Sequence, residues 1–202
     1  MGVKKAWESE RLTKRAAIRA EVDTAIELFL SHRDHVSAHV LAWAATEILR
    51  GIAKAKNQET FQQSLETSIK SDGVKEWRNW IKKSYNFAKH ADRDPIEVIE
   101  AFRPESTSFA LFGACCDYHM IFGQRTWPMV VFQAWFHSRN PSLSTDPVAL
   151  TLSGFSKTFG SPDTQSFRTS TQEASKILLE ARNYPSKVSQ IIPEQWQKTI
   201  EW

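Results

Sequence analysis

The sequence predicts an all-α protein: a compact bundle of five to six core helices, followed by an arm and a terminal helix. Apolar residues recur at the three- and four-residue spacing of amphipathic helices through most of the first 140 residues. Residues 129–132 have strand propensity, but no segment with strict apolar–polar alternation offers them a partner. We therefore expect helices packed on helices, without a substantial sheet.

Four helices are expected in the first 90 residues. An apolar stripe marks the first helix over residues 15–30. Asp34 is a suitable N-terminal cap for the second, which has a wide apolar face and should stop near Asn57. A weaker helix is expected over residues 59–70. After the turn Ser-Asp-Gly, a fourth helix should cover residues 74–88.

The middle of the chain predicts three further helices. Asp94 is followed by a proline, which favours the start of a new short helix. Residues 107–122 carry apolar side chains in nearly every direction, as expected of a central, buried helix. Thr126 and the proline at 128 open another helix over residues 126–138.

The composition changes after residue 140. Residues 141–169 are rich in Ser, Thr and Pro, which is typical of a loop or an arm. Ser170 and Glu173 then have the spacing of a capping box for a last long helix, which we expect to pack back through Leu178 and Leu179. We predict two parts: a helical bundle domain over residues 1–140, and an arm with a C-terminal helix over residues 141–202.

Charge and cysteine content narrow the function classes. Lys and Arg outnumber Asp and Glu by 26 to 23, and a net charge of +3 permits nucleic acid as a partner without requiring it. Cys115 and Cys116 are neighbours, so they exclude paired-cysteine zinc spacing. The sequence has no secretory signal pattern and no run of about 18 apolar residues, so we expect a cytoplasmic protein without a membrane partner.

Eight tryptophans are a large number for 202 residues. Their large apolar area suits a core or a subunit interface. Because of this aromatic content, we expect the protein to form a homodimer.

The stretch NFAKHADRDP, residues 86–95, is the most polar joint between predicted helices. Asn86, Lys89 and His90 fall on the last turn of one helix, followed by Asp92 and Arg93. One interpretation is helix capping, because cations are stabilised at a helix C-terminus. The other is a site in which His90 and Asn86 act on a ligand, while Lys89, Asp92 and Arg93 bind it.

Asp117 is the unexpected acid of the most apolar predicted helix. An ionised carboxylate buried there would need a partner. His90 could be that partner, with Asp117 orienting its imidazole for catalysis, although a structural ion pair would leave the same pattern.

The block NFAKHADRDP, with SAHVLAWAATEILRGIAK upstream, resembles an uncharacterised family of small bacterial helical proteins. More remotely, the arrangement is similar to the HEPN superfamily of helical bundles, whose nucleases carry an arginine, a polar residue and then a histidine. Asn86 and His90 match the last two, whereas Tyr85 stands in place of the arginine. A second match to this spacing lies at Arg33 to His39. The resemblance implies a module that binds RNA or another phosphate-bearing ligand, or a metal-independent ribonuclease-like activity.

A metal site is the alternative interpretation. His35 and His39 are one helical turn apart, and Glu47 follows two turns later, so these residues could bind a cation. Otherwise the histidines are solvated residues near a helix start, and Glu47 pairs with Arg50 or with a neighbouring helix. No cofactor is predicted. Two hypotheses remain: a HEPN-like module for RNA or a nucleotide, or a non-enzymatic interaction or metal-binding bundle that self-associates.

Overall fold

The computed structural model describes residues 12–67, 74–89, 96, 98–100, 102–141, 166–183 and 198–201. These residues form helices and one two-stranded sheet, so the all-α prediction is confirmed. The helices are α1 (Lys14–Leu30), α2 (His35–Ala55), α3 (Phe61–Thr67), α4 (Val74–Lys89), α5 (Pro104–Phe122), α6 (Trp127–Arg139) and α9 (Phe167–Asn183). The strands are β1 (Arg125–Thr126) and β2 (Ile200–Glu201).

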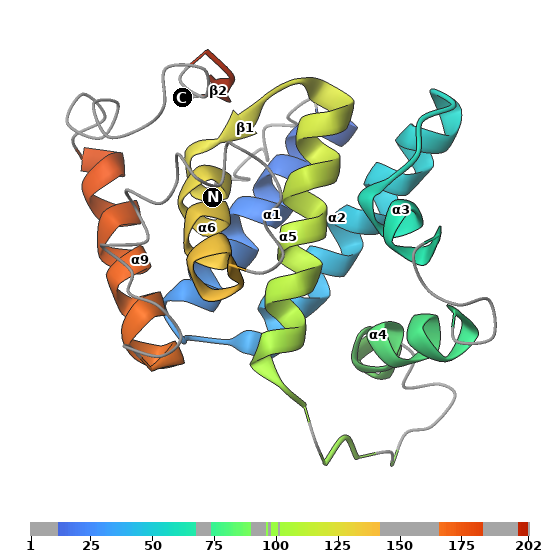
Figure 1. The fold of residues 1–202 in the computed structure, drawn as a ribbon, viewed down its shortest axis with the longest axis horizontal. Helices are drawn as coiled ribbons and strands as arrows, with labels where there is room; N and C mark the ends of the chain where they lie inside the picture. Colours follow the sequence, from blue (N-terminus) through green and yellow to red (C-terminus); the bar gives the residue numbers. More distant parts are fainter. Residues whose placement is uncertain are drawn as a thin grey trace, which may run out of the picture.

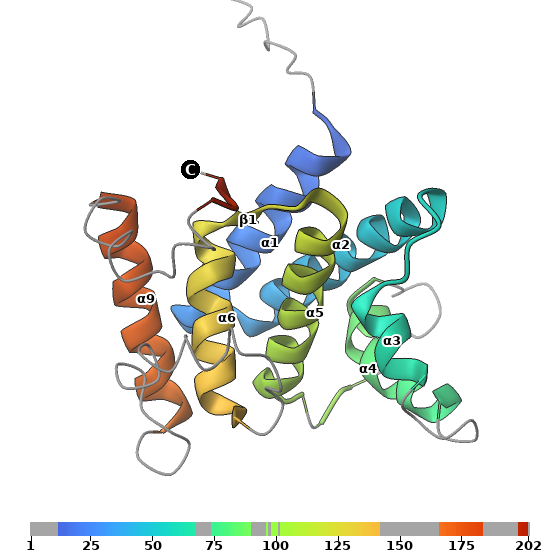
Figure 2. The same cartoon turned by 45° about the horizontal axis from the view of Figure 1, so that its top comes forward.

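Four helices, α1, α2, α5 and α6, pack side by side in the centre of the molecule (Figure 1). Helix α9 covers α6 and α1 at one end, while α3 and α4 lie at the opposite end (Figure 2). None of the helices in the described part of the chain is long and apolar enough to span a membrane.

The predicted helix boundaries are set by local capping. The Asp34 carboxylate accepts hydrogen bonds from the backbone N–H groups of Val36 and Ser37, both at 3.0 Å, as its capping role requires. Thr126 caps α6 by accepting from the N–H of Met129 at 3.4 Å. Helix α5 ends at Gly123, whose φ of 70° is the left-handed conformation in which glycine costs least.

Aromatic side chains fill the region between α1, α6 and α9. The Trp135 ring is 1% exposed and meets the rings of Phe29 and Phe167 edge-on at 5.4 and 5.6 Å. Its indole N–H donates to the Ser170 hydroxyl at 3.1 Å. This buried donor therefore has an acceptor, and α9 is fixed to the core through both apolar and polar contacts.

The start of α9 differs from the predicted one. Ser166, rather than Ser170, accepts a hydrogen bond from a first-turn N–H, that of Thr169, at 3.2 Å. Ser170 is buried within the helix. Leu178 does pack into the core as expected, but Leu179 is 55% exposed, because α9 has only one buried face.

Two other expectations need correction, and one small sheet was not anticipated. A small parallel sheet joins β1 to β2, and its two-residue strands are too short to show a period in the sequence. Val98 and Ile99 are not helical where the short helix after Asp94 was predicted, and residues 90–95 and 97 lie outside the described residues. Helix α5 is not buried on all sides: Phe109 and Met120 are about half exposed.

Candidate functional site

Tyr85 anchors the end of α4 on α2. Its side chain is 5% exposed and packs against the Trp43 ring, with centroids 6.2 Å apart. Its hydroxyl donates a hydrogen bond to Oε2 of Glu47 at 3.0 Å. Burial raises the pKa of Tyr85, so the phenol stays protonated and can act as a donor.

Lys89 completes a polar cluster with Glu47 and Tyr85. Its ammonium Nζ lies 3.2 Å from the Tyr85 hydroxyl and 3.4 Å from Glu47 Oε2. The same Nζ lies 5.1 Å from the centroid of the Tyr85 ring. The hydrogen bond to Tyr85 and the charge of Glu47 raise the pKa of Lys89, so this residue carries a positive charge at neutral pH. Arg50 also approaches Glu47, at 3.9 Å.

Lys83, Asn86, Phe87 and Lys89 are all exposed in the last turns of α4, and we name these four residues the α4 surface. Phe87 is an aromatic ring 38% exposed to solvent, in contrast to the buried Tyr85 two residues earlier. Lys83 and Phe87 are four residues apart, so they are neighbours on one face of the helix. An exposed aromatic ring thus has an exposed lysine one helical turn away.

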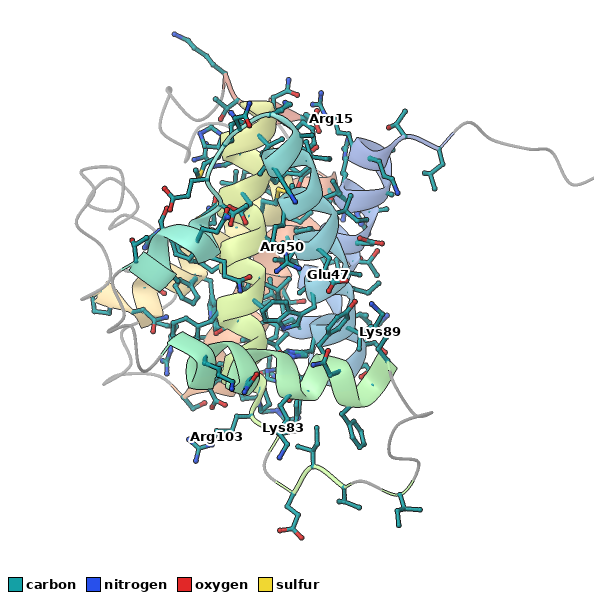
Figure 3. All side chains as sticks on the ribbon, turned by 90° about the vertical axis from the view of Figure 1, so that its right-hand side faces the viewer. Arg15, Glu47, Arg50, Lys83, Lys89 and Arg103 are labelled. Carbon is teal, nitrogen blue, oxygen red and sulfur yellow. The ribbon has the colours of Figure 1, made fainter. Side chains whose placement is uncertain are left out.

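Further cations lie on the same side of the molecule. Figure 3 shows Arg50, Lys83, Lys89 and Arg103 on the side of α2 and α4 that faces the viewer, with Glu47 beside Arg50. Arg103 is exposed just before α5. Figure 3 labels five cations and one acid, Glu47, which pairs with Arg50 and Lys89. The excess of cations lets this face attract an anion.

The structure describes only part of the predicted polar joint. Asn86 and Lys89 lie on the last turn of α4, as expected. His90, Asp92 and Arg93 lie outside the described residues. The predicted contact between His90 and Asp117 therefore stays a prediction.

Asp117 has a structural partner. It is 1% exposed on α5, and its Oδ1 accepts a hydrogen bond from the backbone N–H of Phe61, at the start of α3, at 2.5 Å. Burial raises the pKa of this carboxyl to about 6, against the opposing effect of the Phe61 N–H. Oδ2 has no hydrogen-bond partner among the described residues. Asp117 thus joins α5 to α3, whereas Lys89 joins α4 to α2.

The three residues of the metal hypothesis have separate partners. Nε2 of His35 lies 3.1 Å from a ring nitrogen of His32. His39 is 2% exposed, its Nδ1 lies 3.2 Å from the Thr107 hydroxyl, and burial lowers its pKa to about 4. Glu47 bonds to α4, as described above. No group of three or more His, Cys, Asp or Glu residues able to hold a metal ion occurs among the described residues, so the structure does not bring these residues together.

The sequence interpretation found Glu47 as a candidate and included its pairing with Arg50 or a neighbouring helix, which is confirmed. It missed Lys83 and Phe87. The available signal was the four-residue spacing of a lysine and a phenylalanine on the side of α4 opposite Tyr85.

Comparison of the chain with protein-family models, with curated proteins and with solved structures gives no match. The resemblance described above therefore rests on the residues quoted for it.

Proposed function

We propose that the protein is a HEPN-like helical module that binds single-stranded RNA on the α4 surface. The observation that carries the proposal is the partly exposed Phe87 ring, which has the exposed Lys83 one turn away on a helix held to the bundle by Tyr85. A cytoplasmic location, expected from the sequence, fits such a ligand.

The cations support binding of the phosphate backbone. Lys83 and Lys89 are exposed on α4, and Arg50 and Arg103 lie on the same side of the molecule (Figure 3). Each phosphate that such a residue neutralises releases a condensed counterion, which makes the affinity depend on salt. Lys89 is held in place by Tyr85 and Glu47, so less side-chain entropy is lost when it meets a phosphate.

Phe87 supports binding of single-stranded rather than double-stranded RNA. Unpaired bases can stack on an exposed aromatic ring, whereas bases in a duplex are stacked on one another. Asn86 is exposed on the adjacent position and offers both a donor and an acceptor to a base edge.

Binding rather than cleavage is proposed because of Tyr85. At the position of the nuclease arginine, this buried phenol supplies no permanent cation. Lys89, whose Nζ is 3.2 Å from the Tyr85 hydroxyl, is the residue that could substitute. In the HEPN resemblance His90 would be the general acid or base, a role that stays a prediction.

Fluorescence anisotropy with a labelled oligouridylate of about 12 nucleotides tests the proposal. We expect Lys83→Ala and Lys89→Ala each to weaken binding about threefold to tenfold and to reduce the salt dependence by about one counterion. Lys176→Ala on α9 is the matched control, because it removes an exposed lysine at the opposite end of the molecule (Figure 1).

Equal affinities for all three variants and the unaltered protein would contradict an α4 site. Electrophoresis of the same RNA after incubation tests cleavage. RNA cleavage that is lost in His90→Ala would show that the protein is a ribonuclease and not only a binding module.

A further inference from the structure

A shallow groove of about 680 Å³ runs along the outer side of α2. Its floor is the face of α2 that points away from α1 and α5, and Tyr85 of α4 and Lys14 of α1 stand at its two sides. The lining is mainly apolar and comprises Lys14, Ala44, Glu47, Ile48, Gly51, Ile52, Ala55, Lys56 and Tyr85.

The floor of the groove has the spacing of a helix-packing seam. Ala44, Ile48, Gly51 and Ala55 follow one another at intervals of four, three and four residues, the heptad pattern of two helices packed along their length. Three of these four residues are small, so a second helix could approach closely. A Cβ atom added at Gly51 would meet no atom within 4 Å, which shows that the middle of the seam is open.

We infer that this groove binds the same α2 face of a second copy of the chain, with the two α2 helices antiparallel. In that arrangement a twofold axis near the middle of the seam places Ile48 opposite Gly51 of the other copy and Ala44 opposite Ala55. The seam is thereby complementary to itself, with a large residue facing a small one at its centre.

The charges beside the seam support the antiparallel direction. Glu47 and Lys54 occupy equivalent positions one heptad apart on the edge of α2 that lies toward α4. A twofold axis across the helices brings this edge against the same edge of the other copy, so each Glu47 lies near a Lys54 of the other copy. Parallel helices would instead bring Glu47 against the opposite edge, which carries Ile52. They would also place Lys14 and Lys56 of the two copies at the same end, where like charges repel.

This dimer does not depend on RNA binding. Its seam consists of α2 residues, whereas Lys83 and Phe87 of the proposed RNA site lie on the side of α4 opposite Tyr85. Two copies would carry two α4 surfaces on one particle and bind a longer RNA more tightly than a short one.

Sedimentation velocity over a concentration series from about 1 to about 100 µM, without RNA, tests the inference. We expect a dimer at the upper end of this range. Gly51→Glu should remain a monomer, since it places a charge in the middle of the apolar seam. It should melt at the same temperature as the unaltered monomer or higher, because glutamate favours a helix more than glycine does and the added Cβ meets nothing. Ala55→Glu, at the end of α2, repeats the test at a second position.

A charge reversal tests the direction of the helices. Lys54→Glu should weaken the dimer about tenfold, because two pairs of like charges replace two opposite pairs, whereas Lys54→Arg, which keeps the charge, should leave it unchanged. Lys176→Glu on α9 is the control and should leave the dimer unchanged. A monomer at about 100 µM, a dimer that survives both Gly51→Glu and Ala55→Glu, or a dimer that is unaffected by Lys54→Glu would overturn the inference.

Discussion

Helices α6 and α4 illustrate two different ways in which a helix is held in this protein. Ten of the 13 residues of α6 are buried, including Phe132, Trp135 and Phe136. In the last turns of α4, by contrast, Tyr85 is buried while its neighbours Asn86, Phe87 and Lys89 are exposed. Among the described side chains of these last turns, the buried phenol of Tyr85 and its hydrogen bonds join α4 to α2, while Asn86, Phe87 and Lys89 are exposed.

This difference indicates where the molecule can change without losing its fold. A side chain of α6 has neighbours on almost every side, so its removal leaves a cavity. A side chain on the outer side of α4 is partly exposed to water, so its removal costs less stability than removal of a buried one. We therefore expect stability to reside in the core and binding to reside on α4.

The largest effect is expected for Trp135→Ala. The variant should lose about 3–5 kcal/mol of unfolding free energy, because it removes a fully buried indole and leaves the Ser170 hydroxyl without its donor. Chemical denaturation followed by circular dichroism measures this loss. A loss below about 1 kcal/mol would show that α6 is not packed as described.

The next effect depends on pH and tests the buried carboxyl of Asp117. Its pKa rises from the ordinary value of 3.8 to about 6 on folding, so its stabilising contribution is complete below pH 3.8 and is lost as the pH rises through 6. Relative to Asp117→Asn, the unaltered protein should therefore lose up to about 3 kcal/mol of stability between pH 4 and pH 7. The asparagine variant keeps an oxygen that can accept from the Phe61 N–H.

Thermal melts of both proteins in matched buffers across this pH range provide the comparison. Because Asp23, whose pKa is also raised to about 6, is present in both proteins, its contribution cancels in the difference. A difference that stays constant with pH would show that Asp117 titrates normally in the folded protein.

A smaller effect is expected for Tyr85→Phe. This change keeps the ring against Trp43 and removes the hydroxyl that bonds to Glu47 and Lys89, at a cost of about 1 kcal/mol. Hydrogen exchange should show faster exchange of the α4 amides while those of α6 keep their protection. Equal acceleration in both helices would contradict the separation of α4 from the core.

The core was predictable from the sequence because its signals are local and periodic. Asp34 and Thr126 cap their helices as expected, since capping depends on residues two or three positions away. Ser170 was misassigned because a hydroxyl in a capping pattern can equally serve a distant tryptophan, and the contact with Trp135 joins positions 35 residues apart. The pairing of β1 with β2 likewise joins distant segments through only two residues each.

The site was less predictable than the core. The sequence identified Asn86, Lys89 and Glu47 as candidate site residues, but Glu47 was assigned to a possible metal site. Helical spacing alone does not show that Lys89 of α4 is the partner of Glu47. The need of Asp117 for a partner was predicted correctly. The partner found is the backbone N–H of Phe61 in α3. This contact depends on tertiary packing, which leaves no pattern in the sequence.

The most direct test of the central claim, that α4 binds RNA while the core supplies stability, is one paired measurement on Phe87→Ala. Leu179→Ala on α9 is the matched control, since it removes another exposed apolar side chain at the opposite end of the molecule. Each variant should change the unfolding free energy by about 1 kcal/mol at most, far less than Trp135→Ala does. Phe87→Ala alone should weaken the binding of single-stranded oligouridylate by about tenfold, as expected for the loss of one stacked base. Unchanged RNA affinity in Phe87→Ala, or an equal loss in Leu179→Ala, would contradict the account.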